Sequence, residues 1–261
     1  MDLKGAVAIV TGSSSGIGAA CVRLLASKGC NVVVNYAHNE APAREVAAEC
    51  EAQGVEALVC RANVASDDDC RRMVQEAVEK WGRVDGLVNN AGTTKFVNHH
   101  DLDGLSGQDF LDIYAVNVVG AYQMVRAAAP HLKASGQGSV VNVSSVAGVM
   151  GSGSSIAYAA SKGALNTMTL SLARVLGPEI RVNTVCPGFV QGAWLRNGMG
   201  PERYDATLEG LRRNAPLRRA GTAEDMAEAI VWFLEGACHI TGEFLMTDGG
   251  NHLLQVPVGG R

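Results

Sequence analysis

Short apolar runs alternate along the chain with longer segments in which apolar residues recur every three or four positions. The short runs are nearly continuous in apolar residues, which is typical of strands covered on both faces of a parallel sheet. They predict strands at residues 6–11, 31–36, 56–62, 84–89, 139–144, 180–185 and 244–247. The longer segments predict helices at residues 17–28, 41–53, 67–81, 108–134, 157–176 and 223–235. We expect Asp67 to cap the third of these helices and Thr222 to cap the last.

Strands and helices that alternate at this spacing predict βαβ units, and hence an α/β fold with a doubly wound parallel sheet. No change in composition marks a linker, so we expect residues 1–261 to form a single domain. The segment at about 191–219 departs from the alternation, and an insertion of this length is expected to be a lid or binding loop. It holds six arginines against three acidic residues. It is therefore either a solvated surface helix or a cover that favours an anionic substrate.

Composition narrows the class of protein. Apolar residues make up 47% of the chain and charged residues 18%, which indicates a soluble globular protein. The net charge of −4 and the aromatic content of 5% argue against a nucleic-acid partner. The seven cysteines include no CxxC pair, and no apolar run approaches the roughly 18 residues of a membrane span. We expect a cytoplasmic protein with no membrane partner and no metal site, and we expect the pair His99 and His100 to be surface residues.

A glycine-rich loop follows the first predicted strand. Residues 11–18 read Thr-Gly-Ser-Ser-Ser-Gly-Ile-Gly, and a predicted helix begins there. Glycine lets the backbone turn sharply and approach a pyrophosphate, and the free N–H groups of a helix N-terminus favour phosphate. The spacing is G-x3-G-x-G rather than G-x-G-x-x-G. Its place between a strand and a helix nevertheless predicts a dinucleotide site.

Tyr158 and Lys162 lie four residues apart, so they share one face of a predicted helix. A free tyrosine titrates near pH 10, and a neighbouring ammonium favours the phenolate. We therefore expect Lys162 to lower the pKa of Tyr158 and to make the pair a proton shuttle for carbonyl and alcohol chemistry. By itself this spacing is also that of an ordinary surface pair.

The glycine loop, the sequence Asn-Asn-Ala-Gly at 89–92 and the Tyr158/Lys162 pair occur together and in this order. In this combination the chain resembles the short-chain dehydrogenase/reductase family, and most closely members similar to 3-oxoacyl-acyl-carrier-protein reductases. The resemblance extends from Lys4 to about Leu253 and implies a Rossmann-type fold. Further matches are Val-Val-Asn-Val-Ser-Ser at 140–145, Asn117, Cys-Pro-Gly at 186–188, Ile-Thr-Gly at 240–242 and Asp-Gly-Gly at 248–250.

The resemblance implies a site of four catalytic residues. Ser145, thirteen residues before Tyr158, would hydrogen-bond the substrate carbonyl or hydroxyl. Tyr158 would be the acid in reduction and the base in oxidation, while Lys162 would lower its pKa and bind the nicotinamide ribose. Asn117 would hold a water that connects Lys162 to solvent; the alternative is a buried polar group bonded to the backbone. The cofactor would carry the hydride.

The resemblance also implies a set of dinucleotide-binding residues. Besides Tyr158 and Lys162, the set comprises Gly12, Ser14, Ser15, Gly16, Ile17, Gly18, Tyr36, Ala37, His38, Asn63, Val64, Asn89, Ala91, Gly92, Pro187, Gly188 and Val190. Asn63 stands where the family usually has aspartate beside the adenine, and its carbonyl oxygen can still accept from the adenine amino group. Gly192 stands where a threonine often contacts the carboxamide. That bond is either lost or supplied elsewhere, for example by the backbone of Val190.

The end of the second strand indicates which cofactor is used. An acidic residue there would bind a ribose 2′-hydroxyl and repel a 2′-phosphate, and none occurs before Glu40. Relatives specific for NADP often carry a basic residue where this chain has Ser15, which leaves His38 as the candidate partner of the phosphate. We expect NADP(H) to be favoured over NAD(H), with use of both as the alternative.

The main hypothesis is an NAD(P)-dependent oxidoreductase that interconverts a secondary alcohol and a ketone of a small molecule. One alternative is a 3-oxoacyl-acyl-carrier-protein reductase, but residues 135–138 and Glu179 lack the basic docking face that an acidic carrier needs. A dinucleotide-binding regulator is the non-enzyme alternative, and the presence of all four catalytic residue types argues against it. The resemblance implies a homotetramer. The tail at 253–261 extends past the usual end and is expected to reach a neighbouring subunit.

Overall fold

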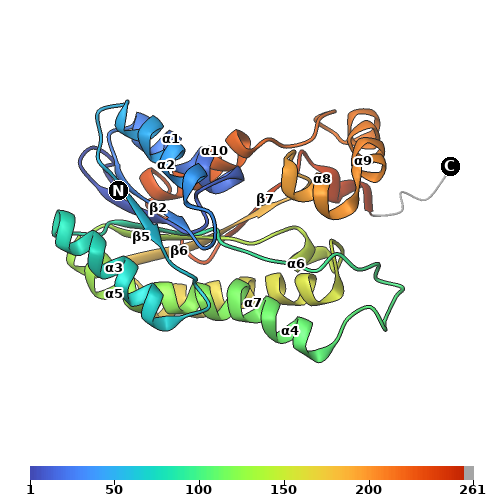
Figure 1. Cartoon of the computed structure of the whole chain (residues 1–261), viewed down its shortest axis with the longest axis horizontal. Coiled ribbons are helices and arrows are strands. Elements are labelled where there is room, and N and C mark those ends of the chain that lie inside the picture. Colours follow the sequence, from blue (N-terminus) through green and yellow to red (C-terminus); the bar gives the residue numbers. More distant parts are fainter. Residues whose placement is uncertain (256–261) are drawn as a thin grey trace.

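The computed structural model describes residues 1–255 and is built on one parallel sheet (Figure 1). Its strand order is β3-β2-β1-β4-β5-β6-β7. The strands are β1 (Val7–Val10), β2 (Asn31–Tyr36), β3 (Ala57–Arg61), β4 (Gly86–Asn89), β5 (Gly138–Val143), β6 (Ile180–Pro187) and β7 (Phe244–Thr247). The predicted doubly wound sheet and its strands are confirmed. Most of the predicted tail lies outside the described residues.

Helices cover both faces of this sheet (Figure 1). One layer contains α1 (Gly16–Ser27), α2 (Glu40–Glu51) and α10 (Ala223–Glu235), and the other contains α3 (Asp67–Trp81), α5 (Ala121–Ala134) and α7 (Ile156–Leu176). Side chains of a strand alternate between the two cores: Ala8 and Val10 pack with the first layer, and Ile9 packs with the second. All three are fully buried, which explains why the strands read as continuous apolar runs.

The predicted helix at 108–134 is wrong in one respect, because it is not a uniform α-helix. It consists of α4 (Gly107–Tyr114), the π-helical segment η1 (Ala115–Gly120) and α5. Gly120 packs so closely on Val64 that a Cβ at Gly120 would lie 2.8 Å from a Val64 methyl carbon and 2.9 Å from its carbonyl oxygen. The wider turn therefore coincides with a contact between distant parts of the chain.

The prediction that Asp67 caps the third helix is wrong, and the one for Thr222 is confirmed. Ser66 is the N-cap of α3, and its hydroxyl accepts from the Asp69 N–H at 3.3 Å. Asp67 is instead the first helical residue, where its carboxylate pairs with Arg71 and Arg126. Thr222 caps α10 through a complete capping box with Asp225.

Two helices fill the insertion between β6 and α10, namely α8 (Ala193–Met199) and α9 (Pro201–Asn214). They lie beyond the carboxyl ends of the strands, apart from the two main layers (Figure 1). The short helices α6 (Ala147–Met150) and η2 (Asn251–Gln255) complete the described elements. Among the helices within residues 1–255, none has the length and apolar character needed to cross a membrane.

Candidate active site

A cavity of about 1530 Å³ opens at the carboxyl ends of the strands. Its walls come from the segments after β1, β2, β3, β4, β5 and β6, and from α7, α8 and α9. The strand order reverses between β1 and β4, and ligands of doubly wound sheets bind at such a point. All of the predicted site residues line the cavity except Gly18, Asn89 and Asn117, which lie behind its wall.

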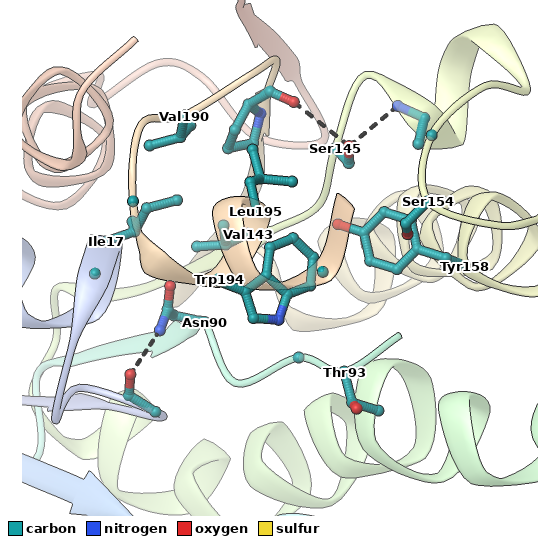
Figure 2. Close-up of a pocket in the computed structure, with 18 of the residues that line it drawn as sticks. Ile17, Asn90, Thr93, Val143, Ser145, Ser154, Tyr158, Val190, Trp194 and Leu195 are labelled. Carbon is teal, nitrogen blue, oxygen red and sulfur yellow. Dashed lines mark hydrogen bonds between the residues drawn. The ribbon is translucent and has the colours of Figure 1, made fainter. Parts of the chain in front are cut away.

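The glycine loop is clamped from two sides. The Gly12 N–H donates to Asn35 Oδ1 at 2.8 Å, and Asn35 Nδ2 donates to the Ala62 carbonyl at 3.0 Å. Asn90 Nδ2 donates to the carbonyls of Thr11 and Gly12 at 2.8 and 3.1 Å (Figure 2). A Cβ at Gly18 would lie 2.6 Å from Asn90 Nδ2 and from the Gly12 oxygen, so only glycine fits there. Gly18 thus shapes the loop rather than facing the cavity.

The loop presents bare backbone to the cavity at the start of α1. Gly16 has φ +54°, and a Cβ there would meet no atom within 4 Å. The N-cap Ser15 makes no side-chain cap bond, and the first N–H groups of a helix have no partner within it. Free donors, the positive end of the helix dipole and open space fit a diphosphate.

The ends of β2, β3 and β4 form a second part of the cavity. Tyr36 is buried there, and His38 is exposed at the rim. Asn63 also lines the cavity, but its Oδ1 already accepts from the Ala65 N–H at 3.1 Å. Asn89 is buried and donates to Asn142 Oδ1 at 2.9 Å, so it connects β4 to β5.

Ser145, Tyr158 and Lys162 meet where β5 and β6 end. Ser145 Oγ accepts from the Ala147 N–H at 3.1 Å and donates to the Pro187 carbonyl at 3.4 Å (Figure 2). Lys162 Nζ donates to the Val143 carbonyl at 2.8 Å and lies 5.6 Å from the centre of the Tyr158 ring. The hydroxyl of Ser155 accepts from the Tyr158 N–H and caps α7. Strand ends and a helix N-terminus therefore bring the three side chains together.

Burial controls the ionisation of this group. It raises the pKa of Tyr158 to about 12, although a hydrogen bond with Ser145 acts in the opposite direction. It also lowers the pKa of Lys162 to about 8. The net pKa of Tyr158 is therefore raised, because loss of water around the phenol outweighs the hydrogen bond with Ser145. That Lys162 lowers this pKa stays a prediction.

Asn117 lies in the π-helical segment and is buried. Its Oδ1 accepts from the Thr93 N–H at 2.8 Å, and its Nδ2 donates to the Thr93 carbonyl and to Ser161 Oγ, both at 3.0 Å. A Cβ at Gly92 would lie 3.5 Å from Asn117 Oδ1 and 3.6 Å from Lys162 Nζ. Gly92 thus leaves a narrow space between the two side chains. The predicted role of Asn117 in holding a water there stays a prediction.

The loop that faces the predicted nicotinamide side joins β6 to α8. Pro187, Gly188 and Val190 line the cavity, and a Cβ at Gly188 would lie 2.4 Å from Asp248 Cβ. Gly192 has no side chain to offer the cofactor, and its N–H donates to the Tyr204 hydroxyl at 3.1 Å. α9 therefore holds this loop in place through Tyr204.

Several cavity residues have no counterpart in the sequence-based set. They are mainly Phe96, Val97 and His99 from the segment after β4. Trp194, Met199 and Arg203 of α8 and α9 also line the cavity, and they belong to the insertion at 191–219 that was expected to form a lid or binding loop. His99 is half-buried and lines the cavity, so its placement on the surface is wrong, whereas His100 is exposed as expected. The apolar pair Phe96 and Val97 between polar residues is the feature of the sequence that could have indicated a role in the cavity. Among the described residues, no group of three or more His, Cys, Asp and Glu side chains is placed to hold a metal ion.

Comparisons with known proteins agree with this geometry. A family model described as enoyl-(acyl carrier protein) reductase matches residues 12–252. The ketoacyl reductase 2 assigned to the granaticin polyketide synthase of Streptomyces violaceoruber is 45% identical over 248 residues, which is 95% of this chain and 96% of that protein. The 3-oxoacyl-(acyl-carrier-protein) reductase FabG of Staphylococcus epidermidis is 34% identical and covers 94% of this chain and 98% of its own length.

Solved structures of similar proteins superpose on this chain over nearly its whole length. A protein of Burkholderia xenovorans assigned to the short-chain dehydrogenases/reductases superposes with a TM-score of 0.88 at 40% identity, over 95% of this chain and 98% of that one. An NAD+-bound xylitol dehydrogenase superposes with a TM-score of 0.86 at 27% identity, over 96% of this chain and the whole of that one.

Proposed function

Because the chain belongs to the short-chain dehydrogenase/reductase family, we propose that it reduces the ketone of a 3-oxoacyl thioester with NADP(H) as the favoured cofactor. At the family level, it is an NAD(P)-dependent oxidoreductase that interconverts secondary alcohols and ketones. One observation carries the proposal: Ser145 and Tyr158 line the same cavity as the glycine loop. The names of the ketoacyl reductase and FabG relatives support a 3-oxoacyl substrate.

The catalytic roles follow from the side chains. Tyr158, with a pKa of about 12, is protonated at neutral pH and can donate its proton to a ketone oxygen. The Ala147 N–H positions the Ser145 oxygen, and the hydroxyl proton, which the Pro187 carbonyl accepts at 3.4 Å, can turn to that ketone oxygen as a second donor. Lys162 is fixed by Val143 beside the Tyr158 ring, where it can stabilise the phenolate left behind. Asn117 keeps the neighbouring Thr93 loop in place.

The residues of the cavity fit a nicotinamide dinucleotide. The backbone from Gly12 to Ile17 would hold the diphosphate, the group around Tyr36 and Asn63 the adenosine, and the loop from Pro187 to Val190 the nicotinamide. When bound, the nicotinamide supplies or accepts the hydride. Asn63 would need to use its remaining lone pair toward adenine, since Ala65 already donates to it.

The preference for NADP(H) rests on the rim at the end of β2, where His38 is exposed and no acidic side chain precedes Glu40. His38→Asp should raise KM for NADPH far more than KM for NADH, because a carboxylate repels the 2′-phosphate and accepts from a 2′-hydroxyl. Initial rates with both cofactors measure this. An equal change in the two KM values would show that this rim does not contact the ribose.

The central test compares wild type with Tyr158→Phe. Both should bind NADPH in a fluorescence titration, while reduction of an acetoacetyl thioester should fall at least about 100-fold in the variant, as expected for loss of a general acid. Tyr122→Phe, on the exposed side of α5, is the matched control. Undiminished turnover in Tyr158→Phe would refute the catalytic assignment. Turnover of simple ketones without turnover of the thioester would refute the substrate.

We extend the proposal to assembly and location. The lid at 191–219 would close over substrate through α8 and α9, and the chain would form a homotetramer in the cytoplasm. Exposed apolar side chains at Leu111, Val119 and Val175 support an interface. Seven free cysteines, six of them buried, support a reducing compartment. Light scattering measures the assembly, and a monomeric mass would exclude it.

A further inference from the structure

Three aromatic rings from separate segments gather at the Tyr158 end of the cavity. The rings of Phe96 and Trp194 lie edge to face with centroids 5.6 Å apart. The rings of Trp194 and Tyr158 are 6.2 Å apart and tilted by 49°. The Tyr158 hydroxyl is on the side of its ring that faces Trp194 (Figure 2). A ketone placed against that hydroxyl must therefore lie near the indole.

Contacts with α8 and with the segment before α7 fix the position of these aromatic rings. The Phe96 ring lies over Gly198 of α8, where a Cβ would be only 2.0 Å from a ring carbon. The loop that carries Phe96 is held against the segment before α7, because the Val97 N–H donates to the Ser154 carbonyl at 2.9 Å and the Thr94 and Ser154 hydroxyls bond at 2.7 Å. The indole of Trp194 thus has aromatic neighbours on two sides.

Trp194 nevertheless keeps half of its surface open. It is 50% exposed although it lines the cavity between two rings. A large apolar side chain that serves only to fill a core is normally buried. An indole that is half exposed and held beside a proton donor is suited to stack a flat ring, since aromatic pairs contribute beyond the area that they bury.

We propose that the 3-oxoacyl substrate carries an aromatic or conjugated ring, and that this ring stacks on Trp194 while the ketone meets Tyr158 and Ser145. This inference rests on the proposed function and adds the substrate class. The inference predicts that the protein binds a flat, unsaturated ring more tightly than a saturated ring of equal size. The stacking preference should amount to about 3- to 10-fold in affinity.

The test uses two ketones with one fused bicyclic skeleton, 2-tetralone with an aromatic ring and 2-decalone without one. Calorimetry on the protein saturated with NADP+ gives Kd without turnover. Wild type should bind 2-tetralone at least about 3-fold more tightly than 2-decalone. Trp194→Leu should bring this ratio close to one, while Trp194→Phe should preserve most of it. Trp232→Leu, which removes an exposed indole from α10, is the control and should leave the ratio unchanged.

Two results would overturn the inference: a ratio near one in wild type, or a ratio that survives in Trp194→Leu. The second would mean that the preference for the flat ring does not come from the indole of Trp194. Reduction of the acetoacetyl thioester by wild type and by Tyr158→Phe is measured in parallel. Because the Kd ratio does not depend on turnover, failure of the thioester reaction would refute the proposed function without deciding the stacking.

Discussion

Replacing Lys162 by methionine tests how strongly the fold opposes a buried charge. Lys162 is 4% exposed, and burial lowers the pKa of its ammonium from 10.5 to about 8. Between these two values the unfolded chain binds more protons than the folded one, so the stability of wild type rises with pH there. Below pH 8 the cost of the buried charge is fully present and amounts to about 3 kcal/mol, at 1.36 kcal/mol per pH unit.

Lys162→Met retains most of the length of the side chain and removes the charge. The variant's free energy of unfolding minus that of wild type should therefore fall by about 2–3 kcal/mol from pH 7 to pH 10. Loss of the 2.8 Å hydrogen bond to the Val143 carbonyl adds a cost of about 1–2 kcal/mol, but this cost does not depend on pH. The change of this stability difference with pH thus reports the buried charge separately from the hydrogen bond.

Urea unfolding of both proteins at several pH values between 7 and 10 measures the difference. Lys133→Met removes an exposed ammonium from α5 and should give a difference that stays constant with pH. If the Lys162→Met and wild-type profiles also run parallel, the ammonium is not desolvated in the folded protein. Burial would then not control the ionisation of Lys162.

Two further predictions concern the packing of a glycine at the start of α1 and the N-cap of α3. Gly18→Ala should destabilise the fold by about 1–3 kcal/mol and weaken NADPH binding in a fluorescence titration, because the new methyl group meets Asn90 and the Gly12 carbonyl. Gly210→Ala, in open space on α9, should instead be neutral or stabilising, and equal effects would contradict the packing argument. Ser66→Ala should lower the free energy of unfolding by about 1 kcal/mol through loss of the α3 cap, and an unchanged urea midpoint would show that the cap contributes nothing.

The sheet and its layers could be predicted because the apolar positions in the sequence are the positions that the fold buries. Val7 to Val10 are apolar at every position, and every one is buried. The choice of cap was harder, since Ser66 and Asp67 are adjacent and both residue types favour the N-cap. Backbone conformation decides between them: Ser66 has the extended φ and ψ of a cap, which no propensity specifies.

The missing parts of the site depend on contacts between distant segments. Phe96 and Trp194 are about a hundred positions apart in sequence and meet only because two loops fold over the same strand ends. The raised pKa of Tyr158 has the same origin, since the sequence shows the neighbouring lysine but not how much water is lost. Motif spacing located the Tyr158 and Lys162 pair, and tertiary packing determined its electrostatics.

The π-helical segment at Ala115–Gly120 has a consequence for insertions and deletions. A π turn accommodates one more residue than an α turn, so the segment acts as a one-residue insertion, equivalent to about 100° of rotation. A chain that lacked Val118 could continue from α4 to α5 as one regular helix, with α4 rotated relative to α7, against which it packs. Asn117, however, would turn away from Thr93. The surplus residue therefore sets the direction of the Asn117 side chain, so its loss in a descendant would separate the order of the helices from the position of that side chain.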